Sequence, residues 1–268
     1  MSENDVFGGN TMDALQHKID EAERIAFFGG AGVSTESGIP DFRGVDGLYR
    51  QKYKYPPETI LSHDFFWANT AEFYRYYTDK MVGLDAKPNG AHKKLAELEA
   101  AGKLLGIATQ NIDGLHQAAG SKVVYELHGS VKRNYCTKCR AFYEEDIVVA
   151  AGKRGRMEME RNGLEAAPES YIPRCPKCGG VIKPDVVLYG EALDDETVDN
   201  AVKMIEHADL LIVGGTSLNV YPAAGLIHYF RGNLGIVLLN KQPTSYDGYA
   251  SVILRGNIGD ELSQIVVR

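Results

Sequence analysis

Short apolar runs alternate along the chain with longer segments in which apolar side chains recur at helical spacing. The short runs occupy residues 25–28, 104–109, 123–127, 210–213, 236–239 and 252–254. They are continuously apolar, which is typical of strands in a parallel sheet that helices cover on both faces. A strand with one exposed face would alternate instead. Six buried parallel strands are therefore predicted.

Helices are predicted between these runs, because apolar residues three or four positions apart share one face of a helix. The sets that share a face in this way are Leu15, Ile19 and Ala22; Ala91, Leu95 and Leu98; and Val198, Val202 and Ile205. Gly102 follows the second set at the position where the C-terminus of a helix favours glycine. The alternation of strands and helices predicts an α/β fold with a doubly wound parallel sheet.

Two regions depart from this alternation. Residues 46–92 are rich in tyrosine, phenylalanine and proline and predict a small helical module. Residues 132–183 contain all four cysteines and a polar stretch, 153–170, that we expect to be a mobile excursion. The large domain should then be discontinuous, and the two insertions should form a smaller domain beside it. The segments expected to form the large domain are 1–45, 93–131 and 184–268.

Composition narrows the function classes. With 29 Lys and Arg against 36 Asp and Glu, the chain of 268 residues carries a formal net charge of −7. That balance argues against broad binding to nucleic acid or anionic membranes, which needs a basic surface. The apolar runs are too short to span a bilayer, and the first residues lack a secretory signal pattern. We therefore expect a cytoplasmic protein, with a small-molecule substrate or a lysine-rich protein partner.

The four cysteines form two CxxC pairs, Cys136 with Cys139 and Cys175 with Cys178. Each pair can place two thiolates on one tight turn, and two such turns can close a tetrahedral site of four sulfur ligands. A site of this kind leaves no open position for substrate, so the zinc ion that it predicts is structural. A redox-active dithiol is the alternative, which the matched second pair disfavours.

Polar segments that contain glycine follow several of the predicted strands. They are GGAG at 29–32, TQNIDG at 109–114, ELHGS at 126–130 and GGTSL at 214–218. Ligands of open α/β sheets bind beyond the carboxyl ends of the strands, where glycine lets backbone N–H groups approach phosphate. Taken singly, each segment could equally be a tight turn or the start of a helix. His128 stands at such a strand end and is the candidate general base, because imidazole titrates near neutral pH.

Together, these motifs resemble those of the sirtuins, a family of NAD-dependent protein deacylases. The resemblance rests on GAGVSTESGIPDFRG at 30–44, TQNID, ELHGS, the two CxxC pairs and GTSLNVYPAAG at 215–225, and it covers the chain from about residue 13 to residue 266. Within the family the sequence looks most like the bacterial deacetylase-type members. The resemblance implies a Rossmann-like large domain, a small domain made of a zinc ribbon and the helical module, and a cleft between them for NAD and substrate.

Carried over position by position, the resemblance implies an NAD site and a catalytic set. The cofactor-binding residues would be Ala31, Ser34, Thr35, Phe42, Arg43, Gln110, Asn111, Ile112, Asp113, His128, Gly215, Thr216, Ser217, Asn240 and Ile258. Phe42 and Arg43 would lie in a mobile loop that closes over NAD. The catalytic residues would be His128, Asn111 and Asp113, and the four cysteines would bind Zn²⁺.

The implied reaction consumes NAD as a co-substrate. The acetyl-lysine oxygen attacks C1′ of the nicotinamide ribose and nicotinamide leaves, while Asn111 and Asp113 hold nicotinamide in the productive pose. His128 then removes a proton from the ribose 3′-hydroxyl, which lets the 2′-oxygen attack the acyl carbon. Water completes the reaction, which gives free lysine and 2′-O-acetyl-ADP-ribose.

The peptide side of the cleft is implied by two segments. Val187, Leu188, Tyr189, Gly190 and Glu191 match the family's extended segment that ends in phenylalanine-glycine-glutamate, with tyrosine in place of phenylalanine at position 189. Together with Asn219, Val220 and Tyr221 they would pair with the substrate peptide as an added strand. The implied partners are acetylated lysines of proteins.

The acyl group is expected to be neutral. Sirtuins that remove succinyl groups resemble one another in a tyrosine-x-x-arginine pair on the helical module, and the matching positions here are Tyr74 and Tyr77. A carboxylate on the acyl group would therefore lack a guanidinium partner.

Three other functions stay open. Removal of other neutral acyl groups and transfer of ADP-ribose to protein would use the same scaffold. A zinc-ribbon module could also sense NAD without turnover. A dehydrogenase is disfavoured, because its glycine motif would need a third glycine where Thr35 stands.

Overall fold

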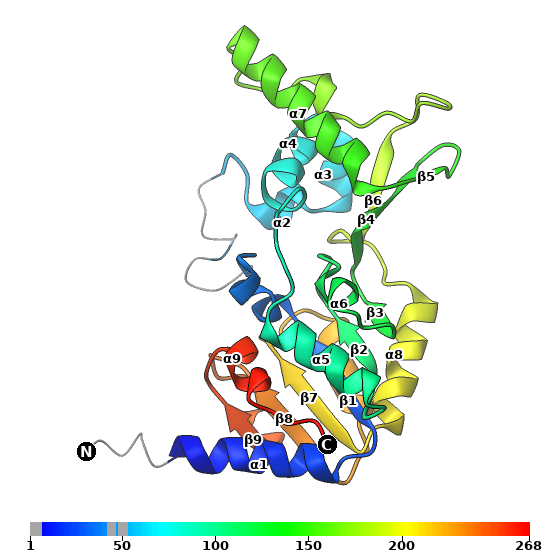
Figure 1. Ribbon diagram of the computed structural model, residues 1–268. Helices are drawn as coiled ribbons and strands as arrows, with labels where there is room; N and C mark the ends of the chain where they lie inside the picture. Colours follow the sequence, from blue (N-terminus) through cyan, green and yellow to red (C-terminus); the bar gives the residue numbers. More distant parts are fainter. Residues whose placement is uncertain (1–6, 42–46, 48–52) are drawn as a thin grey trace, which may run out of the picture.

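The computed structural model describes residues 7–41, 47 and 53–268. Figure 1 shows a larger part that contains a six-stranded sheet and, above it, a smaller part that contains a three-stranded sheet. The first described helix, α1 (Phe7–Glu21), and the C-terminus both lie on the larger part. Within the described ranges, no helix combines the length and the apolar character that a membrane span needs.

The large sheet confirms all six predicted strands. In sheet order, with every neighbouring pair parallel, they are β3 (Val124–Glu126), β2 (Leu104–Thr109), β1 (Ile25–Gly29), β7 (Leu210–Gly214), β8 (Gly235–Leu239) and β9 (Ala250–Leu254). The chain order along the sheet reverses between β1 and β7. In doubly wound sheets this reversal opens a crevice at the carboxyl ends of the strands, where dinucleotides bind.

Helices cover both faces of this sheet, and β1 shows why its strands are continuously apolar. Its residues Ile25 and Phe27 belong to one hydrophobic cluster and the alternate residues, Ala26 and Phe28, to another. The first cluster includes side chains of α1 (Phe7–Glu21), α5 (Gly90–Ala100) and α9 (Ile258–Ser263). The second includes α8 (Asp195–His207) and the 3₁₀ segment η6 (Ala223–Tyr229). The three predicted helical faces all pack on the sheet in this way.

The small part combines an antiparallel sheet with helices. Its strands, in sheet order, are β5 (Phe142–Tyr143), β4 (Gly129–Cys136) and β6 (Ile182–Val186). Its helices are α2 (Pro57–Ile60), α3 (His63–Ala68), α4 (Thr70–Lys80) and α7 (Glu145–Asn162), followed by η5 (Glu169–Tyr171). β4 and β6 run through positions 131 and 183, at which the sequence analysis divides the chain into domains. That division stays a prediction.

The stretch 153–170 is not the excursion that the sequence predicts, because most of it is helical. α7 extends to Asn162, and η5 follows. The face of α7 that packs on the module contains Gly152 and Gly155, and a Cβ on these glycines would lie 2.5 Å from Thr78 and 2.2 Å from the Tyr171 ring. A buried face made of such small residues leaves little hydrophobic signal in a polar run.

The two positions that match the tyrosine-x-x-arginine pair of some sirtuins lie away from the cavity. Tyr74 and Tyr77 are fully buried in the aromatic core of the small part. The Tyr74 hydroxyl donates to the Ile182 carbonyl, and Tyr77 stacks on Phe73 with ring centroids 5.3 Å apart. Neither tyrosine is among the described residues that line the cavity discussed below.

Candidate active site

A cavity of about 990 Å³ lies between the two parts, at the carboxyl ends of β1, β2 and β7. The larger part contributes the loops that follow these strands, and the smaller part contributes apolar side chains such as Leu61, Met81 and Leu84. The predicted cofactor- and peptide-binding residues that line it are Ala31, Ser34, Thr35, Gln110, Asn111, Ile112, Asp113, His128, Val187, Leu188, Tyr189, Gly190, Glu191, Gly215, Thr216, Ser217, Asn219, Val220, Tyr221, Asn240 and Ile258. Phe42 and Arg43 lie outside the described residues.

The glycine motif after β1 lets two strand-end loops pack backbone against backbone. Gly30 donates to the Gly214 carbonyl at 3.1 Å and Gly32 to the Gly215 carbonyl at 2.8 Å. A Cβ on Gly32 would lie 2.7 Å from the Gly215 Cα atom, closer than real Cβ contacts. Gly215 itself has a φ of +61°, a conformation that favours glycine. The chain then turns through two short 3₁₀ segments, η2 (Ala31–Val33) and η3 (Thr35–Ser37).

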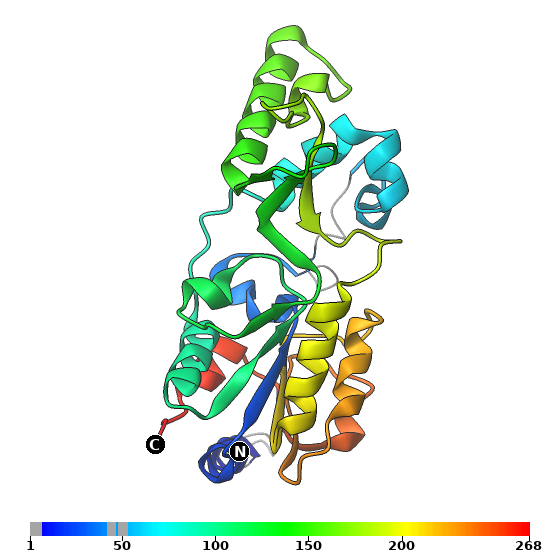
Figure 2. The same ribbon diagram turned by 90° about the vertical axis from the view of Figure 1, so that its right-hand side faces the viewer.

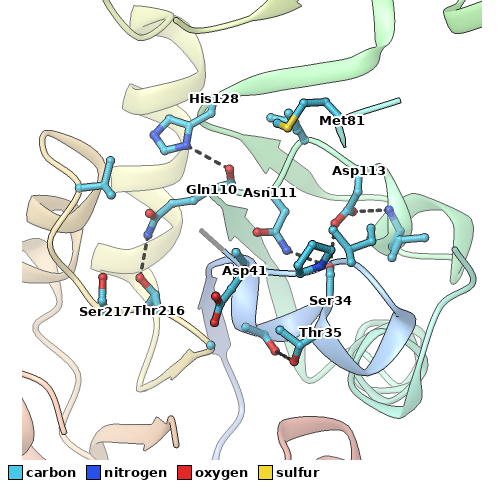
Figure 3. Close-up of a pocket in the computed structure, with 18 of the residues that line it drawn as sticks. Ser34, Thr35, Asp41, Met81, Gln110, Asn111, Asp113, His128, Thr216 and Ser217 are labelled. Atoms are coloured by element: carbon cyan, nitrogen blue, oxygen red, sulfur yellow. Dashed lines mark hydrogen bonds between the residues drawn. The ribbon is translucent and has the colours of Figure 1, made fainter. Parts of the chain in front are cut away.

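A polar network joins the loop after β1 to the loop after β2. Ser34 Oγ donates to Asp113 Oδ2 at 2.7 Å and accepts from Asn111 Nδ2 at 3.1 Å (Figure 3). The other Asp113 carboxylate oxygen accepts the Leu115 N–H at 2.9 Å. Both oxygens of Asp113 are thereby held, and the two residues predicted to hold nicotinamide converge on one hydroxyl group.

His92 extends this network and was missed by the sequence analysis. Its Nε2 lies 3.5 Å from Ser34 Oγ, and its Nδ1 contacts Asn89 at the start of α5. Burial lowers the pKa of His92 to about 4, against the opposing effect of Asp113, so the imidazole is neutral. The sequence could have indicated His92, because it stands beside the apolar face of a predicted helix. A polar residue at such a position is buried in the core, and a buried polar residue needs an explanation.

His116 packs against His92 with ring centroids 4.8 Å apart. It is 1% exposed, and neither ring nitrogen has a partner among the described residues. Burial, with a smaller contribution from His92, lowers the pKa of His116 to about 3. Two neutral histidines therefore lie side by side behind the site.

His128 follows β3 and faces the cavity. Its Nδ1 lies 3.0 Å from the Gln110 carbonyl oxygen, which can only accept, so Nδ1 carries the proton and Nε2 is left as the basic nitrogen (Figure 3). Burial lowers the pKa of His128, and the bond to Gln110 partly opposes this. The imidazole is thus neutral and oriented at neutral pH, as a general base requires.

The Gln110 side chain reaches across to the loop after β7. Its Nε2 donates to Thr216 Oγ1 at 3.1 Å, and the same oxygen accepts the Leu218 N–H at 3.2 Å. Thr216 is 7% exposed, so this hydroxyl fixes the loop more than it faces solvent.

The predicted peptide segment 187–191 is anchored at several points. Val187 N donates to the His128 carbonyl at 3.0 Å, and Tyr189 exchanges backbone hydrogen bonds with Leu61 and His63 at 2.9 Å each. The Glu191 carboxylate turns back to accept the Leu188 N–H at 2.9 Å and a Lys183 Nζ–H at 3.0 Å. Its side chain therefore supports the segment from within.

The four cysteines meet at the far end of the small sheet. Their sulfur atoms all lie within 4.8 Å of one another, with Cys136 and Cys178 at 3.4 Å and Cys139 and Cys175 at 3.6 Å. Sulfur ligands around a tetrahedral zinc ion are about 3.8 Å apart, given Zn–S bonds of about 2.3 Å. The N–H groups of Lys138 and Cys139 point at Cys136 Sγ at 3.4 Å, as expected for a thiolate. The residues fit a structural zinc site, and none of the four is among the described residues that line the cavity.

The fold and the cavity define an α/β dinucleotide-binding protein with a second, metal-binding module. A sequence model of the Sir2 family matches residues 30–222, and the chain belongs to that family.

Relatives and solved structures agree with this assignment. The chain is 51% identical to an NAD-dependent protein deacetylase of Clostridium acetobutylicum, over 95% of this chain and 98% of that protein. It is 41% identical to one of Staphylococcus aureus, over 93% and 95%. A Sir2 structure with a p53 peptide and NAD⁺ has a TM-score of 0.77 at 35% identity, with 94% of this chain and 95% of that chain covered. A Sir2 variant with a deacetylated p53 peptide and 3′-O-acetyl ADP-ribose has a TM-score of 0.81 at 36% identity, with 94% and 96% covered.

Proposed function

We propose that this protein is an NAD-dependent protein-lysine deacetylase. The observation that carries the proposal is that one cavity collects the oriented His128, the network of Ser34, Asn111 and Asp113, and the segment 187–191. These groups come from loops far apart in the sequence, and together they provide a base, a polar pocket and an extended peptide-binding edge. The relatives named above have this activity in their names.

The polar pocket is proposed to hold the nicotinamide ribose end of NAD. Asn111 is 8% exposed and Ser34 1% exposed, so their bonds form in a water-poor environment where they hold Asp113 in place. The loop after β7 packs closely on the backbone of Gly30 and Gly32. This loop is proposed to receive the phosphates through Gly215, Thr216 and Ser217. Asn240 and Ile258 are proposed to bind the adenosine end.

His128 is proposed to take the proton of the ribose 3′-hydroxyl through Nε2, while Nδ1 stays bonded to the Gln110 carbonyl. The apolar side chains of Ile112, Val131 and Met81, which line the same cavity, favour a neutral acyl-lysine because burial of a free ammonium group is costly. Zinc, held by the four cysteines, would supply folding free energy to the small part and no catalytic step.

The peptide is proposed to lie between segments 187–191 and 219–221. Since Val187 N and both backbone groups of Tyr189 already bond to the protein, peptide pairing would use other backbone groups of these segments. The cytoplasmic location and the lack of a nucleic-acid partner stay predictions.

The test is nicotinamide release, measured with an acetylated and with an unacetylated peptide. We expect release only with the acetylated peptide, and free lysine in equal amount. The substitution His128→Ala should lower kcat about 10²- to 10⁴-fold, the range for loss of a general base. His207→Ala, which removes an exposed histidine on α8, is the matched control and should leave kcat unchanged. Transfer of labelled ADP-ribose to protein without loss of the acetyl group would refute the proposal. Binding of NAD without release of nicotinamide would refute it as well.

A further inference from the structure

The strand that follows His128 contains a bulge. β4 pairs with β6 at Gly129↔Val186 and Ser130↔Asp185, and the pairing resumes only at Asn134↔Pro184, so residues 131–133 have no partner on β6. Figures 1 and 2 show that these two strands extend from the small part towards the large sheet. Bulges beside active sites re-aim side chains that a regular strand would point elsewhere.

The residues on either side of Arg133 are held by contacts of their own. Val131 N donates to the Ile112 carbonyl at 3.0 Å, in the loop after β2. Lys132 pairs with Glu145 in the first turn of α7. Asn134, which is fully buried, donates from Nδ2 to the Val131 carbonyl at 3.3 Å. The third bulge residue, Arg133, therefore starts from a backbone that is fixed on both sides.

Arg133 connects the two halves of the proposed site. Its Nη1 lies 2.6 Å from Glu126 Oε2 and its Nε lies 2.7 Å from Asp185 Oδ2. Glu126 is two residues before His128, and Asp185 is two residues before Val187. A single guanidinium group thus joins the segment that carries the base to the segment that carries the peptide edge. The planar fork of arginine suits two fixed carboxylates better than the single charge of lysine.

The two carboxylates differ in a way that makes the link testable. The Glu126 side chain is 7% exposed, and Arg133 is its only ion-pair partner among the described residues, whereas the Asp185 side chain is 41% exposed. Loss of Asp185 leaves Glu126 paired, so the fold should survive. Loss of Arg133 would leave the buried Glu126 carboxylate without an ion pair. The protein would then be less stable, and a change in activity could not be assigned to peptide positioning.

We propose that Arg133 is a positioning residue, which holds the peptide segment 187–191 in register with His128 through Glu126 and Asp185. The direct bond from Val187 N to the His128 carbonyl closes the same connection on the backbone. The role rests on the proposed deacetylase function. It makes the affinity for the acylated peptide depend on a side chain that lines neither the NAD pocket nor the acyl pocket.

The test uses Asp185→Leu in the full-length, zinc-loaded protein. We expect the KM for an acetylated peptide to rise roughly threefold to tenfold, while the KM for NAD changes by less than about twofold. Direct titration of a fluorescent acetylated peptide should show the same loss of affinity. Glu169→Leu breaks the exposed Arg174–Glu169 pair of the same small part and is the matched control, expected to leave both KM values unchanged.

A double substitution, Glu126→Gln with Arg133→Met, removes the guanidinium group and the buried charge together and should reproduce the peptide-specific change. Zinc content and the unfolding temperature are measured alongside. Wild-type peptide KM in a folded Asp185→Leu protein, or equal changes in both KM values, would overturn the inference. Failure of the wild-type protein to release nicotinamide with acetylated peptide would instead overturn the proposed function.

Discussion

The two sheets of this molecule are held together by different means. The large sheet lies between two clusters of buried aliphatic and aromatic side chains, one on each face. The far end of the small sheet has a cluster with only Cys136, Cys175 and Ile182 as buried members among the described residues. Two of these three are proposed metal ligands. A metal site therefore replaces hydrophobic packing at this end of the small part, whereas the remainder of the small part packs around its aromatic core.

The largest effect should come from the metal end. We expect Cys136→Ser to abolish zinc binding and with it the fold of the small sheet, because structural zinc contributes on the order of 10 kcal/mol in small modules. Deacetylation should be lost entirely, since β4 and β6 carry the segments that reach His128 and Val187. Zinc stoichiometry and peptide deacetylation check this.

The comparison is sharpened by hydrogen exchange on the same variant. Amides of β1 and β7 should keep their protection, whereas those of β4 and β6 should lose it. Loss of amide protection in both sheets together would show that the metal stabilises the whole molecule. The two sheets would then not be stabilised by different means. Thr137→Ser, which keeps a hydroxyl group beside Cys136, is a matched control that should retain zinc.

A smaller effect is expected from the packed sheet. Ile212 is fully buried on the central strand β7, so Ile212→Ala should lower the free energy of unfolding by about 2–5 kcal/mol, from lost burial and the cavity left behind. Zinc content should stay unchanged. Val266→Ala, at a position 55% exposed, should cost less than about 0.5 kcal/mol. Chemical denaturation measures the free energy of unfolding of both variants. Loss of zinc from Ile212→Ala at temperatures below its unfolding would contradict the view that the two sheets are stabilised separately.

The same contrast explains how far the sequence predicts this fold. Continuous apolar runs such as 210–213 identify strands because both faces of the sheet are covered. Paired CxxC motifs identify metal ligands because their spacing alone places two sulfur atoms on one tight turn. α7 was misread because Gly152 and Gly155 make its contacts through the absence of a side chain. The bulge at 131–133 left no pattern at all, since its register depends on the partner strand.

The candidate site divides in a similar way. Residues at strand ends, such as His128 and Asp113, could be predicted to lie at the cavity, because position along a parallel sheet predicts position in space. His92 joins the polar network behind the site from α5, and its contact with Ser34 links residues 58 positions apart, which no local pattern predicts. Apolar wall residues such as Met81 carry no chemical signal, so only the assembled structure identifies them.

The smallest expected effect concerns acid. His92 and His116 are neutral in the large part, with pKa values of about 4 and about 3, whereas an unfolded histidine titrates near 6.5. Between these values the unfolded chain binds more protons than the folded one, so stability is complete above about pH 6.5 and falls as the pH drops. Each histidine should cost about 2 kcal/mol at pH 5 relative to pH 7.

His116→Phe isolates this contribution, because phenylalanine can occupy the site beside Phe27 and removes two ring nitrogens that have no partner in the described part of the chain. The variant should lose less stability between pH 7 and pH 5 than the wild type, by about 2 kcal/mol. His17→Gln, at an exposed position of α1, should change nothing. Acid also weakens thiolate ligation of zinc, so protection of β1 amides must be followed separately from zinc release. If stability falls with pH in the same way in the wild type and in His116→Phe, acid acts through the zinc site alone, and the buried histidines do not contribute to the loss of stability.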